Sequence, residues 1–144
     1  MERTPVARID WNQFNTWNRR DAAMTKFWNR PLVDWTILFI MRQSVKSCLD
    51  YGCGYFDLGR ALIPYLERVD GYDPHVPSVQ QARERLTPST KNVSLYSDPD
   101  RLVPGSYDMI VVNSVIQYFH NQHEVEAFFQ RSHWLLRRNG YLLI

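Results

Sequence analysis

The chain has 144 residues, enough for one domain with a sizeable buried core, and its 44% hydrophobic and 22% charged residues are ordinary for a globular protein. Its formal net charge is only +2, because 17 basic residues are scattered among 15 acidic ones, and this argues against a nucleic-acid partner. No apolar run reaches the ~18 residues that span a bilayer, so the sequence predicts no membrane partner.

Residues 1–46 are expected to form a helical, aromatic-rich cover, because four of the five tryptophans lie in this segment. Asp10 can cap a helix that begins at Trp11, and Pro31 is well placed in the first turn of a second apolar helix, over residues 32–41. The tryptophans are interpreted as helix-packing residues or, alternatively, as a lid over a ligand and the apolar wall of a substrate pocket. The segment lacks the apolar core of a secretory signal, so we expect a cytoplasmic protein.

From residue 47 onward, predicted strands and helices alternate, which predicts an α/β domain over residues 47–144. We expect a Rossmann-like, doubly wound, mostly parallel sheet of about five strands, with helices on both faces. Cys48 and Cys53 are expected to be free, reduced thiols. The predicted order is strand 47–51, helix 58–66, strand 68–72, helix 76–86, strand 92–96, strand 107–113, helix 124–137 ended by Asn139-Gly140, and strand 141–144.

A glycine turn follows the first predicted strand, where Asp50 precedes Gly52 and Gly54. In open α/β sheets, ligands bind beyond the carboxyl ends of the strands, and glycines let the backbone approach closely. An acidic residue after the second strand can accept both hydroxyls of a ribose, and one after the third can accept the amino group of adenine, so the pattern suits a nucleoside. The small and acidic residues at the other predicted strand ends are Asp73, Ser97, Asp98, Asn113, Ser114 and Val115.

Four segments in this order resemble the motifs of class I S-adenosylmethionine-dependent methyltransferases that modify small molecules. The segments are Leu49–Gly54, Val69–Asp73, Tyr96–Asp98 followed by Tyr107–Phe119, and Leu135–Ile144. The resemblance covers roughly residues 47–144 and is more specific than a single Gly-x-Gly, because the spacing of all four segments is suitable. It implies a cofactor-binding domain that uses S-adenosylmethionine to methylate a small-molecule acceptor.

The resemblance also implies roles for individual residues. Asp50 and the turn residues Tyr51, Gly52 and Gly54 would hold the methionine part of the cofactor. Asp73, followed by Pro74, would bind the ribose, whereas Ser97, Asp98 and Pro99 would lie at the adenine. Asn113, Ser114 and Val115 would line the methionine side and the mouth of the substrate site. A general base matters only for an acceptor atom that carries a proton, and His120 is the candidate. No metal site is expected, because His120 and His123 have no further ligand at a matching spacing.

Three departures from the family pattern leave an alternative open. Phe56 stands where the family often has a third glycine, and it is expected to narrow the turn. Pro99 has no N–H to offer the adenine ring. The family's sheet normally continues through a sixth and a seventh strand, which are not found here. The alternative is therefore a truncated or degenerate module without catalysis that binds S-adenosylmethionine or a partner protein.

The fifth predicted strand, over residues 141–144, is expected to lie at an exposed, apolar edge of the sheet. Such edges are usually covered in proteins, and a homodimer or a partner chain could cover this one.

A nicotinamide-dependent oxidoreductase ranks last among the functions considered, because Asp57 stands at the third-glycine position of the dinucleotide-binding fingerprint.

Overall fold

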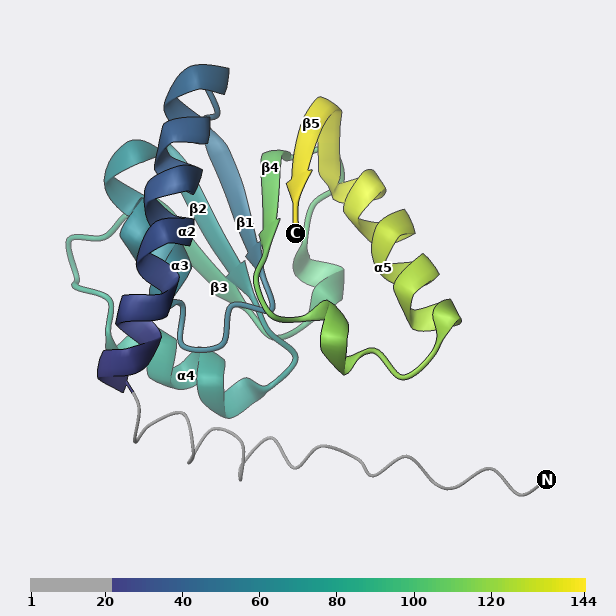
Figure 1. Ribbon diagram of the computed structural model, residues 1–144, viewed down its shortest axis with the longest axis horizontal. Helices are drawn as coiled ribbons and strands as arrows, with labels where there is room; N and C mark the ends of the chain where they lie inside the picture. Colours follow the sequence, from purple (N-terminus) through teal and green to yellow (C-terminus); the bar gives the residue numbers. More distant parts are fainter. Residues whose placement is uncertain (1–21) are drawn as a thin grey trace.

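The computed structural model describes residues 22–144, with side chains from residue 30 onward, and shows an α/β domain built on one parallel sheet (Figure 1). The strand order is β3-β2-β1-β4-β5, so the order reverses between β1 and β4. A doubly wound sheet is therefore confirmed, and its ligand-binding crevice is expected at that reversal. The strands are β1 (Ser47–Tyr51), β2 (Arg68–Tyr72), β3 (Val93–Tyr96), β4 (Tyr107–Val112) and β5 (Leu136–Leu143).

Helices cover both faces of the sheet (Figure 1). On one face lie α2 (Ala22–Gln43), α3 (Asp57–Leu62) and α4 (Val76–Glu84), and on the other lies α5 (Gln122–Leu135). Three single-turn 3₁₀ helices complete the described chain: η1 (Ile63–Tyr65), η2 (Pro99–Arg101) and η3 (Ile116–Tyr118). Of the helices in residues 22–144, none has both the length and the apolar character that a bilayer crossing requires.

The helix before the sheet differs from the prediction at its start. We expected Pro31 in a first helical turn, but Pro31 lies inside α2, which begins at Ala22. Proline lacks an N–H and so removes one hydrogen bond of the helix. Packing outweighs this loss, because Leu32, Ile37 and Ile40 all contact the core beyond the proline. The predicted helix from Trp11 and its Asp10 cap lie outside the described residues.

A buried hydrophobic cluster lies on each face of the sheet, and side chains of β4 belong to both clusters. Met109 and Val111 face the cluster under α2, α3 and α4, whereas Ile110 and Val112 face the cluster under α5. This alternation shows that β4 is buried on both faces of the sheet. Cys48 and Cys53 are buried and unpaired, as expected for free thiols.

The passage from α5 to β5 also differs from the prediction. The helix ends at Leu135. The N–H groups of Gly105 and Ser106 donate to the carbonyls of Trp134 and Leu135, which in a longer helix would accept hydrogen bonds from the following residues. Asn139-Gly140 therefore does not end the helix. It belongs instead to an irregularity within β5, where Tyr107 pairs with Leu136 but Met109 pairs with Tyr141. Asn139 has a left-handed backbone (φ 63°), which asparagine tolerates well.

Candidate functional site

The glycine turn after β1 is tied to the end of β2. The N–H groups of Gly52 and Cys53 both donate to the carbonyl oxygen of Tyr72, at 2.7 and 2.9 Å, and the N–H of Gly54 donates to Oδ2 of Asp73 at 2.8 Å. Gly52 (φ 76°) and Gly54 (φ 49°) both adopt left-handed backbone conformations. The structure thus brings together two predicted motifs that lie about 20 residues apart in the sequence, because parallel neighbours end at the same edge.

The same turn also meets the loop after β4. A Cβ added at Gly52 would lie 2.2 Å from Cγ2 of Val115, so only glycine fits at this contact. At Gly54, by contrast, an added Cβ would find no atom of the described residues within 4 Å. One glycine therefore lets two loops close on each other, and the other leaves open space beside the backbone, where a ligand can approach.

Asp73 lies at the carboxyl end of β2, half-buried beside the glycine turn. Its Oδ1 accepts the N–H of His75 and its Oδ2 accepts the N–H of Gly54, both at 2.8 Å, so each oxygen keeps a lone pair for a ligand. Burial raises the pKa of this carboxyl, and the two backbone hydrogen bonds oppose that rise. The next residue, Pro74, is exposed.

Asp50 is turned into the protein. It is 3% exposed, and its carboxylate accepts the N–H of Gly59, in the first turn of α3, at 2.9 Å. Burial raises its pKa to about 7, despite that hydrogen bond. This hydrogen bond links the end of β1 to the start of α3, on either side of the glycine turn. Tyr51, by contrast, packs on the other face of the sheet, in the cluster under α5.

Phe56 does not narrow the turn, contrary to the expectation from the sequence. Its backbone is left-handed (φ 61°), the conformation that a glycine would adopt without strain, but its side chain is only 1% exposed. The ring fills space that two glycines leave free, Gly59 in α3 and Gly71 in β2: an added Cβ would lie 2.0 Å from the ring at Gly59 and 2.8 Å at Gly71. These two glycines are the sequence signal that could have located the ring in the core.

The end of β3 is held by interactions that the motif pattern did not reveal. Asp98 is exposed, and its Oδ1 accepts the N–H of Asp100 at 2.9 Å, which caps η2. The carbonyl of Pro99 accepts a hydrogen bond from the guanidinium of Arg131 on α5, which also lies 5.4 Å from the ring centre of Trp134. Ser97 is half-buried between these groups and β3. The sequence alone gave no indication of the Arg131 contact.

The end of β4 presents a polar pair. Asn113 is half-buried and Ser114 is exposed with a left-handed backbone (φ 58°), and the Ser114 hydroxyl donates to Oδ1 of Asn113 at 3.3 Å. His120 lies farther along, exposed in the loop before α5, where its backbone N–H donates to Glu124 at 2.8 Å. A catalytic role for its imidazole stays a prediction.

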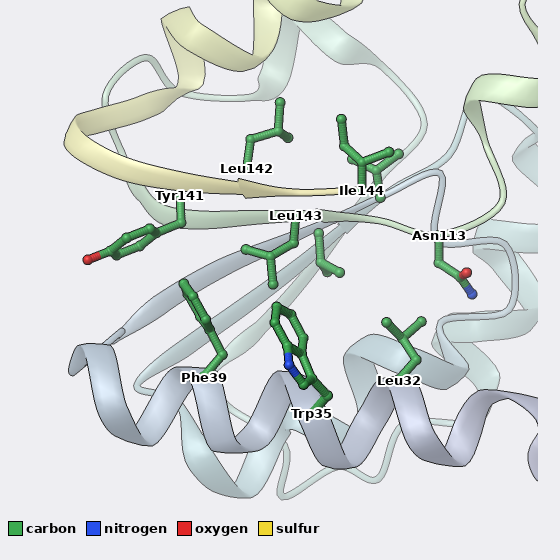
Figure 2. A pocket seen from close by; sticks show the side chains of 10 residues that line it. Leu32, Trp35, Phe39, Asn113, Tyr141, Leu142, Leu143 and Ile144 are labelled. Atoms are coloured by element: carbon green, nitrogen blue, oxygen red, sulfur yellow. The ribbon is translucent and has the colours of Figure 1, made fainter.

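A groove of about 680 Å³ lies between α2 and β5 and reaches Asn113 (Figure 2). Figure 2 shows Leu32, Trp35 and Phe39 of α2 directed toward the strand, with Leu143 pointing back at them. Apart from Asn113, the side chains that line it are apolar or aromatic. The lining residues are Leu32, Trp35, Phe39, Val111, Val112, Asn113, Tyr141, Leu142, Leu143 and Ile144.

Comparisons with solved structures show the same fold. The methyltransferase domain of bacterial CtHen1 matches with a TM-score of 0.64 and 21% identity, over 75% of this chain and 62% of that one. Phosphoethanolamine N-methyltransferase 1 of Haemonchus contortus, in complex with phosphoethanolamine and S-adenosylhomocysteine, matches with a TM-score of 0.59 and 24% identity, over 67% of this chain and 21% of that one. An S-adenosylmethionine-dependent methyltransferase from Mesorhizobium loti matches with a TM-score of 0.56 and 20% identity, over 67% and 44%.

The chain spans less than two thirds of the length of each of these structures. No curated protein matches its sequence. The family model described as a methyltransferase domain matches residues 49–142, which include the glycine turn, Asp73, Asp98 and the end of β4. This match covers more than half of the chain, and the chain therefore belongs to the methyltransferase domain family.

Proposed function

We propose that this chain binds S-adenosylmethionine and serves in the transfer of its methyl group to a small-molecule acceptor. The observation that carries the proposal is the Asp73 carboxylate beside the open backbone of Gly54, at the carboxyl ends of β1 and β2, next to the point where the strand order reverses. Membership of the methyltransferase domain family supports the same chemistry.

The side chains at this edge fit an adenosyl group. Each oxygen of Asp73 has one hydrogen bond from the backbone and can accept a ribose hydroxyl as its second. One oxygen of Asp98 caps η2, which leaves the other for an exocyclic amino group. In the described part of the chain, no atom lies within 4 Å of a Cβ added at Gly54, which leaves room there for a ligand that lies along the backbone. In this assignment Asp50 acts through the position of the turn, since its carboxylate faces α3.

The bound cofactor supplies a sulfonium whose methyl group is already activated, so the residues of this chain mainly orient the reactants and exclude water. Asn113, Ser114 and Val115 would line the methionine end of the cofactor and the mouth of the acceptor site. His120 would accept a proton only from an acceptor that carries one at neutral pH.

Phosphoethanolamine in the Haemonchus contortus structure is one example of a small, polar acceptor in this fold. The alternative function is a module that binds S-adenosylmethionine, or a partner protein, without catalysis. Pro99 favours this alternative, because its missing N–H removes one contact to an adenine ring.

Calorimetric titration with S-adenosylmethionine and with S-adenosylhomocysteine tests the proposal. We expect binding by the wild-type chain and a loss of about 10- to 100-fold in affinity for Asp73→Ala, since a hydrogen bond to a charged group contributes about 1.5–3 kcal/mol. The control Glu84→Gln removes an exposed carboxylate at the far end of α4 and is expected to bind like wild type.

No binding of either compound at millimolar concentration would contradict the proposal. Transfer of a labelled methyl group to a panel of small amines, acids and phenols then separates the two functions. Binding without transfer to any acceptor supports the non-catalytic alternative.

A further inference from the structure

The segment after β3 is a single 3₁₀ turn, η2, with Asp98 as its N-cap. Within the turn, the N–H of Asp100 donates to Oδ1 of Asp98 at 2.9 Å, and the N–H of Leu102 donates to the carbonyl of Pro99 at 3.1 Å. A helical turn of this length has little stability of its own. The direction of the Asp98 carboxylate therefore depends on what holds the turn against the rest of the fold.

The two ends of this turn are held in different ways. At the far end, the side chain of Leu102 is buried in the cluster under α5. At the Asp98 end, the guanidinium of Arg131 on α5 donates to the carbonyl of Pro99, and the same nitrogen lies 3.5 Å from Oδ1 of Asp100. A hydrogen bond from a charged donor is stronger than one from a neutral group. Arg131 is thus bonded to the residue next to Asp98.

The side chain of Arg131 is itself held in place. The neighbouring residues Phe128, Ser132 and Leu135 pack α5 onto the sheet, and each is at most 3% exposed. The guanidinium lies 5.4 Å from the ring centre of Trp134, and the Arg131 side chain is 29% exposed. An arginine held in this way loses little freedom when it donates a hydrogen bond, so it links the turn to a rigid helix.

Pro99 makes the direction of the Asp98 carboxylate more important. Proline has no N–H for an adenine ring, so the second oxygen of Asp98 is the polar group that this turn offers to an exocyclic amino group. Proline also restricts the backbone of the residue before it, and Asp98 is extended (φ −103°, ψ 117°). A hydrogen bond that fixes Pro99 therefore also limits the movement of Asp98.

We propose that Arg131 is a positioning residue for the adenine end of the cofactor, an inference that rests on the proposed function. By holding the Pro99 carbonyl against α5, Arg131 keeps the second oxygen of Asp98 directed at the amino group before the cofactor binds. A preorganised group binds more tightly, because it does not have to be ordered on binding. The effect passes from Arg131 through Pro99 to Asp98, so it concerns recognition of the amino group rather than of the ribose.

Calorimetric titration of the full chain with two ligands tests the proposal. The ligands are S-adenosylhomocysteine and its analogue in which hydrogen replaces the 6-amino group of adenine. We expect the wild type to prefer S-adenosylhomocysteine roughly tenfold, and Arg131→Met to lower this preference to roughly twofold or less. Arg131→Lys keeps one charged donor and is expected to retain more of the preference than Arg131→Met.

The ratio of the two affinities separates positioning from a general loss of structure, because partial unfolding weakens both ligands alike. The control Arg138→Met removes an exposed guanidinium from β5 and is expected to keep the wild-type preference. Asp98→Asn leaves α5 untouched. Asparagine has a single side-chain oxygen, which cannot both cap η2 and accept the amino group, so this variant is expected to lose the preference. In its background, Arg131→Met should then change the ratio little.

The outcomes distinguish this inference from the proposed function. No binding of either ligand by the wild type overturns the proposed function, and the role of Arg131 with it. A wild type that binds both ligands equally overturns the role of Arg131 alone. The same conclusion follows if Arg131→Met leaves the preference unchanged, or if it lowers the ratio as much in the Asp98→Asn background as in the wild type.

Discussion

Replacement of Asp50 by asparagine is expected to stabilise the protein at alkaline pH relative to acidic pH. The carboxylate is buried, and burial raises its pKa in the folded protein from the ordinary 3.8 to about 7. Between these two values, the folded state holds a proton that the unfolded state has released. The stability that depends on this proton is fully present below about pH 4 and is lost as the pH rises to about 7.

The size of the effect follows from the width of that interval. Each pH unit between the two pKa values corresponds to about 1.4 kcal/mol, so from about pH 5 to about pH 7 the wild-type chain loses about 3 kcal/mol through this residue. Asparagine does not titrate, and its oxygen can still accept the N–H of Gly59. The stability of Asp50→Asn relative to wild type should therefore be about 3 kcal/mol greater at pH 8 than at pH 5.

Urea unfolding of both proteins at the two pH values measures this difference directly. A constant free-energy cost of the new amide cancels in the comparison, because it is the same at both pH values. The other titrating groups also cancel, since both proteins contain them. An equal stability difference at pH 5 and pH 8 would show that Asp50 is ionised throughout and would refute the reasoning.

The remaining predictions concern core contacts. Gly59→Ala should destabilise the wild type by about 1–3 kcal/mol, because the new Cβ would lie 2.0 Å from the Phe56 ring, but it should cost little in a Phe56→Ala background. An equal cost in both backgrounds, measured by urea unfolding, would count against this contact. Tyr107→Phe should cost about 1–3 kcal/mol, since the buried Asp70 carboxylate loses a hydroxyl donor at 2.8 Å. Thermal melting compares it with Tyr65→Phe, whose ring is exposed; similar melting temperatures would contradict the prediction.

Local sequence signals were sufficient for the order of the elements and for the strands before β5, which begins at Leu136 rather than at the predicted residue 141. The strands at 47–51 and 68–72 have the bounds predicted for them. Predictions at helix ends were weaker. α2 continues through Pro31 because the residues after the proline pack on the core, and α5 ends where hydrogen bonds from Gly105 and Ser106 replace its own; no local pattern contains either interaction.

For the candidate site, the sequence by itself determined which residue types stand at the ends of the strands. Alternating strands and helices place those ends at one edge, so Asp73 and the glycine turn could be expected to meet, as they do through Gly54. Only the tertiary structure decided where the side chains point. Asp50 faces α3 because the N–H of Gly59 donates to its carboxylate. Phe56 fills the core because Gly59 in α3 and Gly71 in β2 leave room for its ring. Such contacts depend on the packing of several elements at once, and that is the physical reason the motif alone could not reveal them.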